Sequence, residues 1–452
     1  MDSQIARNYA TGSFGLFPSV VGEDTHAPAS KETRMTIWTP NDDGHADLSR
    51  HDSFVNGAPH NTFARLRRDD PLAWCDYADG EGFWSVTRHA DILTLNRDHQ
   101  RLSSARGIRM EDQTYEEYLA RRTFQETDPP EHTRMRTIVG RAFAKPVIGR
   151  FSDQIQALCD DILDQALALG EFDAVYHIAR QLPMRMLGRF LGTPDEDLDW
   201  LVEKGDALIA NTDPEFTDHV LDQADTEAFR LMPFRSPAGA DLFEYGKKLV
   251  AEKRHAKDSV LGLILQPDEN GEVISDQEFR NFFCLLVAAG NDTTRYSIAA
   301  GLHALVNRPE LLTQMRDGGE AIWKTAPDEI IRWASPTFYF RRTATEGFEM
   351  HGKTVRKGDK VLYWFVSGNR DDAAFDNPFE IDLGRKPNRH VAFGQGGPHV
   401  CLGMWLAKLE VHLLFQTLAR RVATIEQTGE HEYLRSNFVG GIKRLPVRVT
   451  LN

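Results

Sequence analysis

Apolar residues recur at helical spacing along most of the chain. In segment 151–169, the apolar residues that would share one helical face are Ile155, Leu158, Ile162, Leu163 and Ala166. Segment 277–308 runs for about 30 residues without a proline, which predicts a helix long enough to cross a whole domain. Further helices are expected over 128–144, 178–192, 326–335 and 402–422. The pattern therefore predicts a mainly α protein.

Strand-like runs are few and scattered. They occur at 82–87, within 348–365 and at 445–451, so we expect small accessory sheets beside the helices. Residues 1–50 are polar and rich in Gly, Pro, Asp and Thr, which indicates an irregular N-terminal extension. No internal repeat interrupts the remainder, and residues 51–452 are expected to form a single domain.

Composition and charge exclude several classes of protein. The chain has 452 residues and a formal net charge of −14, so it lacks the basic surface that nucleic-acid binding requires. No run of 18 apolar residues and no signal peptide is present, so no membrane span is expected and the cytoplasm is the expected location. The four cysteines are far apart and form no CxxC pair, which disfavours a disulfide framework and a zinc site.

One of these cysteines, Cys401, lies in a glycine-rich segment, FGQGGPHVCLG, directly before a predicted helix. The N-terminus of a helix lowers the pKa of a thiol, and the glycines let the backbone approach a flat, bulky group. A P-loop is excluded because no Lys-Ser or Lys-Thr pair follows, and His399 replaces the third glycine of a dinucleotide fingerprint. A buried structural cysteine remains the alternative.

This segment resembles the haem-binding signature of the cytochrome P450 family. The resemblance implies that the Cys401 thiolate is the axial ligand of a haem b iron and that Phe393 and Gly394 belong to its loop. It also implies the family's fold, a triangular, helix-rich single domain with small β-sheets. The spacing from Phe393 to Cys401 is eight residues, one more than is common, and resembles a bacterial subset that acts on sterol- and terpene-type substrates. The resemblance covers roughly residues 55–452.

A second motif, AAGNDTTR at 288–295, lies inside the long predicted helix. The Thr293 hydroxyl can bond to the carbonyl of Ala289, four residues earlier, and loosen the helix there. The resemblance implies that this turn is the family's oxygen-binding kink. It places Ala289 against the cofactor and makes Asp292 and Thr293 an acid–alcohol pair that delivers a proton during oxygen activation. An ordinary packed helix is the alternative.

A third motif is EIIR, in which Glu329 and Arg332 would share one helical face. An exposed pair of this kind is commonplace and stabilises little. The resemblance implies instead a buried pair that is joined by Arg385 and has a structural role in holding the cysteine loop.

A fourth signal is a set of groups that could bind the two haem propionates. His132 and Arg136 are spaced to share one helical face, and His399 lies two residues before the cysteine. The resemblance assigns these three residues and Arg342 to the propionates, with Arg341 as the neighbouring candidate. Taken singly, each arginine could equally be a solvated surface charge.

The resemblance also implies a substrate pocket with apolar walls. Its predicted lining is Val287, Ala288, Pro336, Thr337, Phe338, Phe438 and Val439. These residues favour a hydrophobic small molecule, such as a terpenoid, a steroid or an aliphatic compound. The charged, poorly patterned loop 107–127 is expected to be a mobile lid over the pocket.

The resulting hypothesis is a monomeric monooxygenase that uses O2 and electrons from a ferredoxin-type partner, because the chain has no flavin or iron–sulfur motif of its own. Arg134, Arg141 and Lys408 are candidate docking charges for that partner. A peroxide-driven peroxygenase is an alternative, against which the Asp-Thr pair counts. A non-catalytic haem-thiolate sensor is a second alternative.

Overall fold

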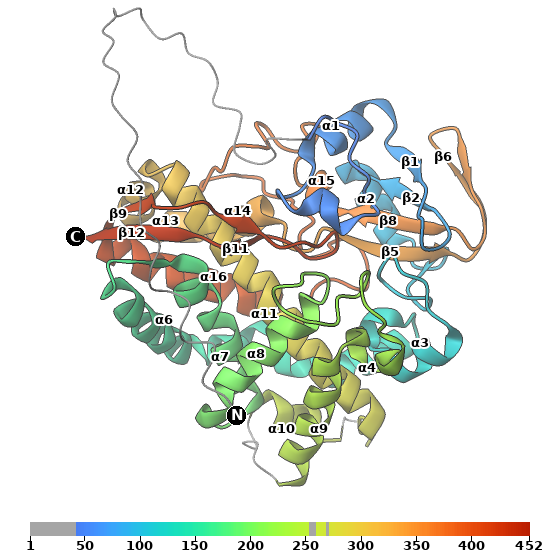
Figure 1. Cartoon of the computed structure of the whole chain (residues 1–452), viewed down its shortest axis with the longest axis horizontal. Coiled ribbons are helices and arrows are strands. Elements are labelled where there is room, and N and C mark those ends of the chain that lie inside the picture. The colour runs from blue at the N-terminus through green and yellow to red at the C-terminus, as the bar shows by residue number, and fades with distance from the viewer. Residues whose placement is uncertain (1–41, 253–258, 268–270) are drawn as a thin grey trace, which may run out of the picture. The chain divides into compact units, whose positions relative to one another are not determined.

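A single long helix, α11 (Asp276–Asn307), runs through the middle of the molecule (Figure 1). Its start is fixed by a capping box between Ser275 and Glu278. It ends before Pro309, because the residue that precedes a proline disfavours helical backbone. The computed structural model describes residues 42–252, 259–267 and 271–452, so most of the predicted N-terminal extension lies outside the described residues. The described residues belong to one compact unit.

The other helices surround α11, and several of them pack directly on it. Their bounds are α1 His60–Asp69, α2 His89–Arg97, α3 Tyr115–Arg121, α4 Glu131–Gly140, α5 Lys145–Gly149, α6 Ser152–Leu167, α7 Gln181–Leu191, α8 Leu198–Ile209, α9 Pro237–Ala251, α10 Val260–Ile264, α12 Glu310–Asp317, α13 Gly319–Trp323, α14 Ala326–Ala334, α15 Phe365–Gly368 and α16 Met404–Arg421. The helices predicted at 128–144, 151–169, 178–192, 326–335 and 402–422 correspond to α4, α6, α7, α14 and α16. The prediction of a mainly α fold is therefore confirmed.

The strands form small sheets at the periphery of the helices. Their bounds are β1 Leu72–Cys75, β2 Phe83–Val86, β3 Leu102–Ser103, β4 Glu171–Asp173, β5 Tyr339–Ala344, β6 Phe348–Met350, β7 Lys353–Val355, β8 Lys360–Trp364, β9 Val422–Gln427, β10 Glu432–Tyr433, β11 Ile442–Arg444 and β12 Pro446–Leu451. The largest sheet among the described residues has the order β1-β2-β8-β5-β3, and only its β2–β8 pair is parallel. In the view of Figure 1, this sheet lies with α1, α2 and α15 on one side of α11, and α6 to α10 lie on the other.

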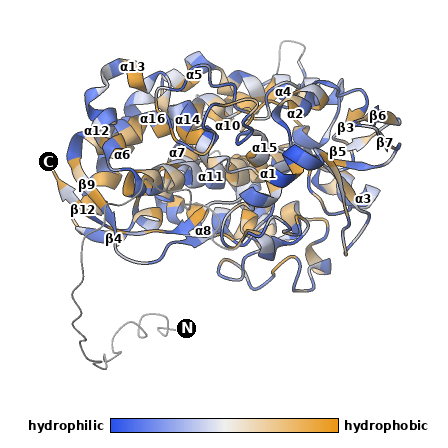
Figure 2. Cartoon of the chain, turned by 90° about the horizontal axis from the view of Figure 1, so that it is seen from above, coloured by the Kyte–Doolittle hydropathy of each residue, from blue (hydrophilic) through white to orange (hydrophobic). Residues whose placement is uncertain are grey.

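Most helices around α11 carry both hydrophilic and hydrophobic residues, as Figure 2 shows by colour. Their apolar faces meet α11 in one continuous core, to which α6, α7, α8, α14 and α16 all contribute buried side chains. Within residues 42–252, 259–267 and 271–452, none of the helices combines the length and apolarity that a membrane span requires.

The segment 107–127, predicted as a lid, contains α3 and a short 3-10 turn, Phe124–Glu126. A capping box between Thr114 and Glu117 begins α3. The side chain of Asn281, on α11, donates hydrogen bonds to the carbonyls of Ala120 and Arg122 at 3.1 and 3.0 Å. The loop therefore packs on α11 in this structure, and its mobility stays a prediction.

Candidate functional site

A cavity of about 930 Å³ lies between α11 and the segment that precedes α16. The α11 wall contributes Ala288, Ala289 and Thr293, and the opposite wall contributes Phe393 and Cys401. The structure thus brings residues of two separate sequence motifs, about a hundred positions apart, to one cavity.

The cysteine loop is held by its own backbone and by α2. The Cys401 N–H donates to the Phe393 carbonyl at 2.9 Å, and Asn96 donates to the carbonyls of Gly394 and Gln395 at 2.8 and 2.9 Å. The Cys401 side chain is exposed, and it lines the cavity. This arrangement fixes a thiol at the cavity wall.

Two glycines of this loop meet requirements of the protein's own backbone. Gly394 adopts a φ of 66°, a conformation that other residues rarely adopt. A Cβ at Gly397 would come within 2.1 Å of the Asn96 backbone oxygen, so this glycine permits close packing on α2. The sequence pattern alone did not reveal this contact with α2, and the predicted approach of the loop to a flat cofactor stays a prediction.

The predicted lowering of the thiol pKa is wrong in its net direction. Although Cys401 is accessible from the cavity, it lies deep in the protein, and the resulting loss of hydration raises the pKa of its thiol above the ordinary value. This effect outweighs the hydrogen bonds from the backbone N–H groups of Gly403 and Met404 and the charge of Arg136, all of which lower the pKa. The thiol is thus protonated in the protein alone, and binding a metal ion at this sulfur would release a proton.

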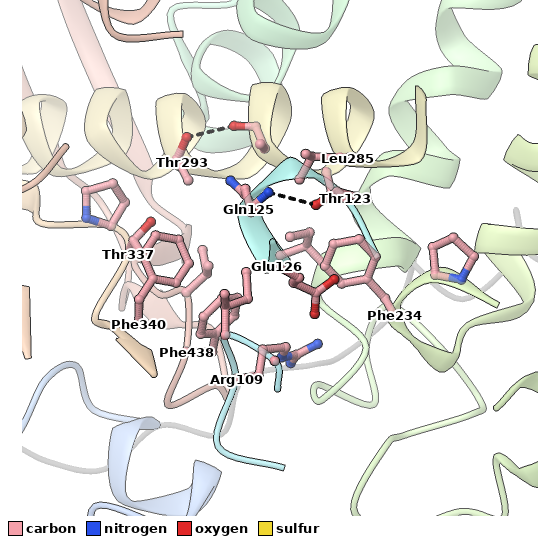
Figure 3. Close-up of a pocket in the computed structure, with 18 of the residues that line it drawn as sticks. Arg109, Thr123, Gln125, Glu126, Phe234, Leu285, Thr293, Thr337, Phe340 and Phe438 are labelled. Carbon is pink, nitrogen blue, oxygen red and sulfur yellow. Dashed lines mark hydrogen bonds between the residues drawn. The ribbon is translucent and has the colours of Figure 1, made fainter. Parts of the chain in front are cut away.

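On the α11 wall, the Thr293 hydroxyl donates to the Ala289 carbonyl at 2.9 Å, the bond that the sequence predicted (dashed in Figure 3). Thr293 lines the cavity, and so does Ala289. The hydroxyl therefore lies at the cavity wall, with its proton directed to a helix carbonyl.

Asp292 lies elsewhere. Consecutive helical residues point about 100° apart, and Asp292 is fully buried and is absent from the cavity lining. Its carboxylate lies 2.6 Å from the Arg295 guanidinium, which also contacts Asp206 at 2.5 Å. Burial raises the pKa of Asp292, against the opposing effect of Arg295. The structure thus does not place the two members of the predicted acid–alcohol pair side by side in the cavity.

Glu329, Arg332 and Arg385 come together in one buried cluster. Arg332 donates two hydrogen bonds to the Glu329 carboxylate at 2.8 Å each, and Arg385 donates from Nε at 3.1 Å. Glu329 and Arg332 are fully buried, and Arg385 also contacts carbonyls of residues 376–380. The cluster joins α14 to the segment that leads into the cysteine loop.

A group of basic side chains lies between α4 and the cysteine loop. The rings of His132 and His399 have centroids 4.2 Å apart, and Arg136 donates to the Val400 carbonyl at 2.6 Å. Both ring nitrogens of His132, Nδ1 of His399 and Nη1 of Arg136 are buried without a hydrogen-bond partner in the described part of the chain. Burial and, to a smaller extent, the charge of Arg136 lower the pKa of His132 to about 4.

The structure also separates the two neighbouring arginine candidates. Arg342 is buried close enough to His132 and His399 to lower the pKa of both. Arg341 instead contacts Asp112, at 3.2 Å, on the far side of strand β5. The geometry therefore groups Arg342, and not Arg341, with His132, Arg136 and His399.

These residues fit the haem that the sequence predicted. Buried donors without acceptors carry a large free-energy penalty, which a bound anion would remove. The two propionates of haem are such anions. Arg136 and His399 line the cavity together with Cys401, which supplies a sulfur ligand, and His132 and Arg342 lie close to His399. His132, Arg136, Arg342 and His399 would hold the propionates, and Cys401 would hold the iron.

Replacing Arg136 by alanine is expected to weaken haem retention without unfolding the protein. A charge-assisted hydrogen bond contributes about 1.5–3 kcal/mol, so haem should be released roughly 10- to 100-fold faster. Transfer of haem to apomyoglobin measures the rate. Arg134→Ala is the matched control on α4, because Arg134 already binds Glu131 at 2.8 Å and also contacts Glu278. Equal release rates for both variants would contradict the propionate assignment.

Of the predicted substrate-pocket residues, the cavity lining includes Ala288, Pro336, Thr337, Phe438 and Val439. Val287 and Phe338 are buried elsewhere: Val287 lies against Gly205 on α8, and the Phe338 ring stacks on Phe54 at 5.4 Å. Both were predicted to line the pocket because they adjoin lining residues in the sequence, but their side chains point away from the cavity. The lining also includes residues that the sequence did not indicate, among them Arg109, Glu126, Phe234, Leu285 and Phe340 (Figure 3).

The three candidate docking charges all have partners. Lys408 lies 2.6 Å from Asp328, and Arg141 donates to the carbonyls of Leu263 and Gln266 at 2.6 Å each. Arg134 is held by two glutamates, as described above. Their role in binding a redox partner stays a prediction.

Comparison with known proteins identifies relatives along nearly the whole chain. A family model described as Cytochrome P450 matches residues 324–445. The protein named cytochrome P450 126 of Mycobacterium tuberculosis is 36% identical over 414 residues, which cover 89% of this chain and 97% of that protein. The steroid C26-monooxygenase of Mycolicibacterium smegmatis is 33% identical, over 87% of this chain and 91% of its own length.

A solved structure resembles the fold closely. It is a cytochrome P450 of Mycobacterium marinum in complex with pseudoionone, with a TM-score of 0.78 and 32% sequence identity. The match covers 93% of this chain and 100% of that one.

Proposed function

Because the chain belongs to the cytochrome P450 family of haem-thiolate monooxygenases, we propose that it inserts one oxygen atom from O2 into a C–H bond of a hydrophobic small molecule. Two electrons would come one at a time from a ferredoxin. The observation that carries this proposal is the single cavity that has the Cys401 thiol on one wall and the Thr293 hydroxyl on the opposite wall.

When bound, the haem supplies the redox chemistry of oxygen activation, which its thiolate ligand promotes by donating electron density to the iron. The protein's own residues hold and orient the cofactor. Cys401 presents the sulfur, and the loop that Asn96 holds keeps it in place. His132, Arg136, Arg342 and His399 would orient the cofactor through its propionates.

Thr293 is the residue that we propose moves a proton in the reaction. Its Oγ1 lies on the cavity wall and can exchange its bond to the Ala289 carbonyl for a bond to a reacting oxygen. The buried Asp292 lies one residue away but faces Arg295. To return a proton to the Thr293 hydroxyl, its carboxylate must turn toward the cavity or act through intervening groups.

The apolar wall supports a hydrophobic substrate. Leu285, Leu286, Phe340, Phe438 and Val439 all line the cavity. Two of the relatives point to related chemistry, one named for a steroid and one bound to pseudoionone. We therefore propose a steroid, a terpenoid or an aliphatic chain as the substrate class.

Replacing Thr293 by alanine is expected to uncouple electron consumption from product formation. The yield of product per NADH consumed should fall about tenfold or more, because a positioned proton donor contributes factors of this order and above. Thr293→Ser keeps a hydroxyl within reach of the Ala289 carbonyl and should retain coupling. If the alanine variant couples as well as the wild type, Thr293 has no part in proton delivery.

One experiment separates the proposed function from its alternatives. Product is measured with hydrophobic candidate substrates, first with NADH, a ferredoxin and its reductase, and then with hydrogen peroxide alone. Turnover that requires the electron-transfer proteins supports the monooxygenase. Faster turnover with peroxide alone favours a peroxygenase, and spectral binding without turnover in either assay favours a sensor.

A further inference from the structure

The cavity has a charged end that lies away from α11. Figure 3 shows Thr293 and Leu285 on α11 and, farther from this helix, Arg109, Glu126 and Phe234. All five side chains line the same cavity. A cavity for a purely hydrophobic molecule does not need an arginine and a glutamate in its wall, because burying charge without a partner is unfavourable.

Arg109 presents its guanidinium between two aromatic rings. The guanidinium carbon lies 4.8 Å from the Phe438 ring centroid and 6.0 Å from that of Phe234. Its nearest carboxylate is that of Glu111, at 3.7 Å, beyond hydrogen-bond distance. Nε of Arg109 is buried and has no hydrogen-bond partner within the described residues. Arg109 and Glu111 thus form an ion pair without a hydrogen bond. The guanidinium is oriented by stacking and keeps hydrogen-bonding capacity that the protein does not use.

The other arginines at this end of the cavity are already engaged. Arg121 donates to Gln113 at 3.1 Å, and Arg235 donates to Glu117 at 3.2 Å. Arg50, at the rim, is 62% exposed and lies 3.6 Å from Asp52. Arg109 therefore differs from its neighbours in combining burial at the cavity wall with unused hydrogen-bonding capacity.

Glu126 supports an anion beside Arg109. Burial raises the pKa of Glu126 to about 7, although Arg121 and Arg109 oppose the shift. This carboxyl therefore takes up a proton at a higher pH than an ordinary glutamate does. In its protonated form it repels no anion and can donate its own hydrogen bond.

Arg109 is also distinct from the basic group that would hold the haem. Arg136 donates to the Val400 carbonyl and the His132 ring lies against that of His399, whereas Arg109 packs on Phe438 and pairs with Glu111. The charges that act on Glu126 and Glu111 include Arg109. The basic group and the Arg109–Glu111 pair are thus separate features of one cavity, with apolar side chains such as Leu285 and Phe340 also in its wall.

We propose that the substrate is an amphipathic monocarboxylic acid whose carboxylate binds Arg109 and whose apolar body extends toward Thr293. The planar guanidinium matches a carboxylate with two parallel hydrogen bonds, which an alcohol or ketone cannot accept. This arrangement directs oxidation to the part of the substrate remote from the carboxylate. The inference rests on the proposed function. It adds that the substrate carries a carboxylate and that the end of the substrate remote from this carboxylate is oxidised.

The test compares acids with their methyl esters, which differ in charge but hardly in shape. The probes are hexadecanoic acid and cholanic acid with the methyl ester of each, titrated into the haem-loaded enzyme. Binding is followed by the haem absorbance shift and by calorimetry. We expect at least one acid to bind roughly 10- to 100-fold more tightly than its ester, since a charged hydrogen-bond pair contributes this much.

The variant Arg109→Gln should remove this preference, because it should weaken binding of the acid and leave binding of the ester unchanged. Arg109→Lys keeps the charge without the planar fork and should give an intermediate preference. Arg50→Gln is the matched control, because Arg50 lines the same cavity from an exposed position. It should leave the preference at its wild-type value.

The outcomes separate this inference from the function on which it rests. Equal binding of acids and esters to the wild type, or an equal loss of both in Arg109→Gln, overturns the carboxylate site and leaves the monooxygenase intact. A failure of all four probes to bind, while neutral terpenes or steroids bind, also overturns it alone. A failure of every hydrophobic compound to bind overturns both.

Discussion

Replacing Cys401 by serine is expected to abolish monooxygenase activity and to change the spectrum of the reduced, carbon monoxide-bound protein. A serine hydroxyl cannot supply the thiolate that donates electron density to the iron. Loss of an outer-shell partner alone typically lowers activity or metal affinity by about 10- to 100-fold, so loss of the ligand itself should exceed about 100-fold. The red-shifted Soret band of a thiolate-ligated carbonyl complex should disappear.

The control for this variant is Cys75→Ser. Cys75 is half-buried on β1, where its sulfur lies 3.3 Å from the Ser85 hydroxyl, and it is absent from the cavity lining. This variant should keep the red-shifted band and the activity. A red-shifted band that persists in Cys401→Ser would show that another group ligates the iron.

The largest loss of stability is expected on replacing Glu329 by glutamine. The fully buried Glu329 carboxylate accepts hydrogen bonds from Arg332, Arg385, Asn388 and the Asp382 N–H. Removing its charge leaves two buried guanidinium groups without their counter-ion, which costs about 3–5 kcal/mol of the free energy of unfolding. Haem should also be lost more readily, because the cluster holds the segment that leads into the cysteine loop.

The unfolding of this variant can be followed in urea by circular dichroism, with haem absorbance recorded in parallel. Glu310→Gln is the control, because Glu310 is about half exposed and pairs with Arg308 at the surface; its effect should stay within about 1 kcal/mol. A loss of under about 1 kcal/mol in Glu329→Gln would contradict the structural role of the cluster.

The effect of Glu329→Gln should also depend on pH. Burial alone would raise the pKa of Glu329, but Arg332, the Asp382 N–H and Arg385 together hold it below its ordinary value of 4.5. A carboxyl group with a lowered pKa in the folded state stabilises the fold fully above its ordinary pKa. That stabilisation is lost as the pH falls through the lower, folded-state value. The difference between wild type and variant should therefore shrink on acidification below about pH 4.

The long elements and the order of the motifs were predictable from the sequence. The start and end of α11 follow from local signals, the Ser275–Glu278 capping box and Pro309. The Thr293 bond to Ala289 is likewise local, since it spans one helical turn. Local patterns of this kind need no knowledge of distant contacts.

Side-chain direction was less predictable. Asp292 lies one residue from Thr293, yet it faces Arg295 and Asp206, because the position of α8 decides which face of α11 binds polar groups. Val287 is turned from the cavity for the same reason. Neither direction can be read from spacing within one helix.

Arg109 shows a second limit of prediction from the sequence. In the sequence it is one charge in a charged loop, and nothing local separates it from Arg121 or Arg106. Its place in the cavity depends on Phe234 and Phe438, which are more than a hundred residues away along the chain. The charged end of the cavity is therefore a property of the tertiary structure.

The most direct test of the central claim is the source of the oxygen in the product. The haem-loaded enzyme is supplied with NADH, a ferredoxin, its reductase, a hydrophobic substrate that shifts the haem spectrum, and isotopically labelled O2. The account predicts one labelled oxygen atom in each product molecule, with formation dependent on the ferredoxin. Unlabelled product, or product formed only when peroxide is added, would contradict it.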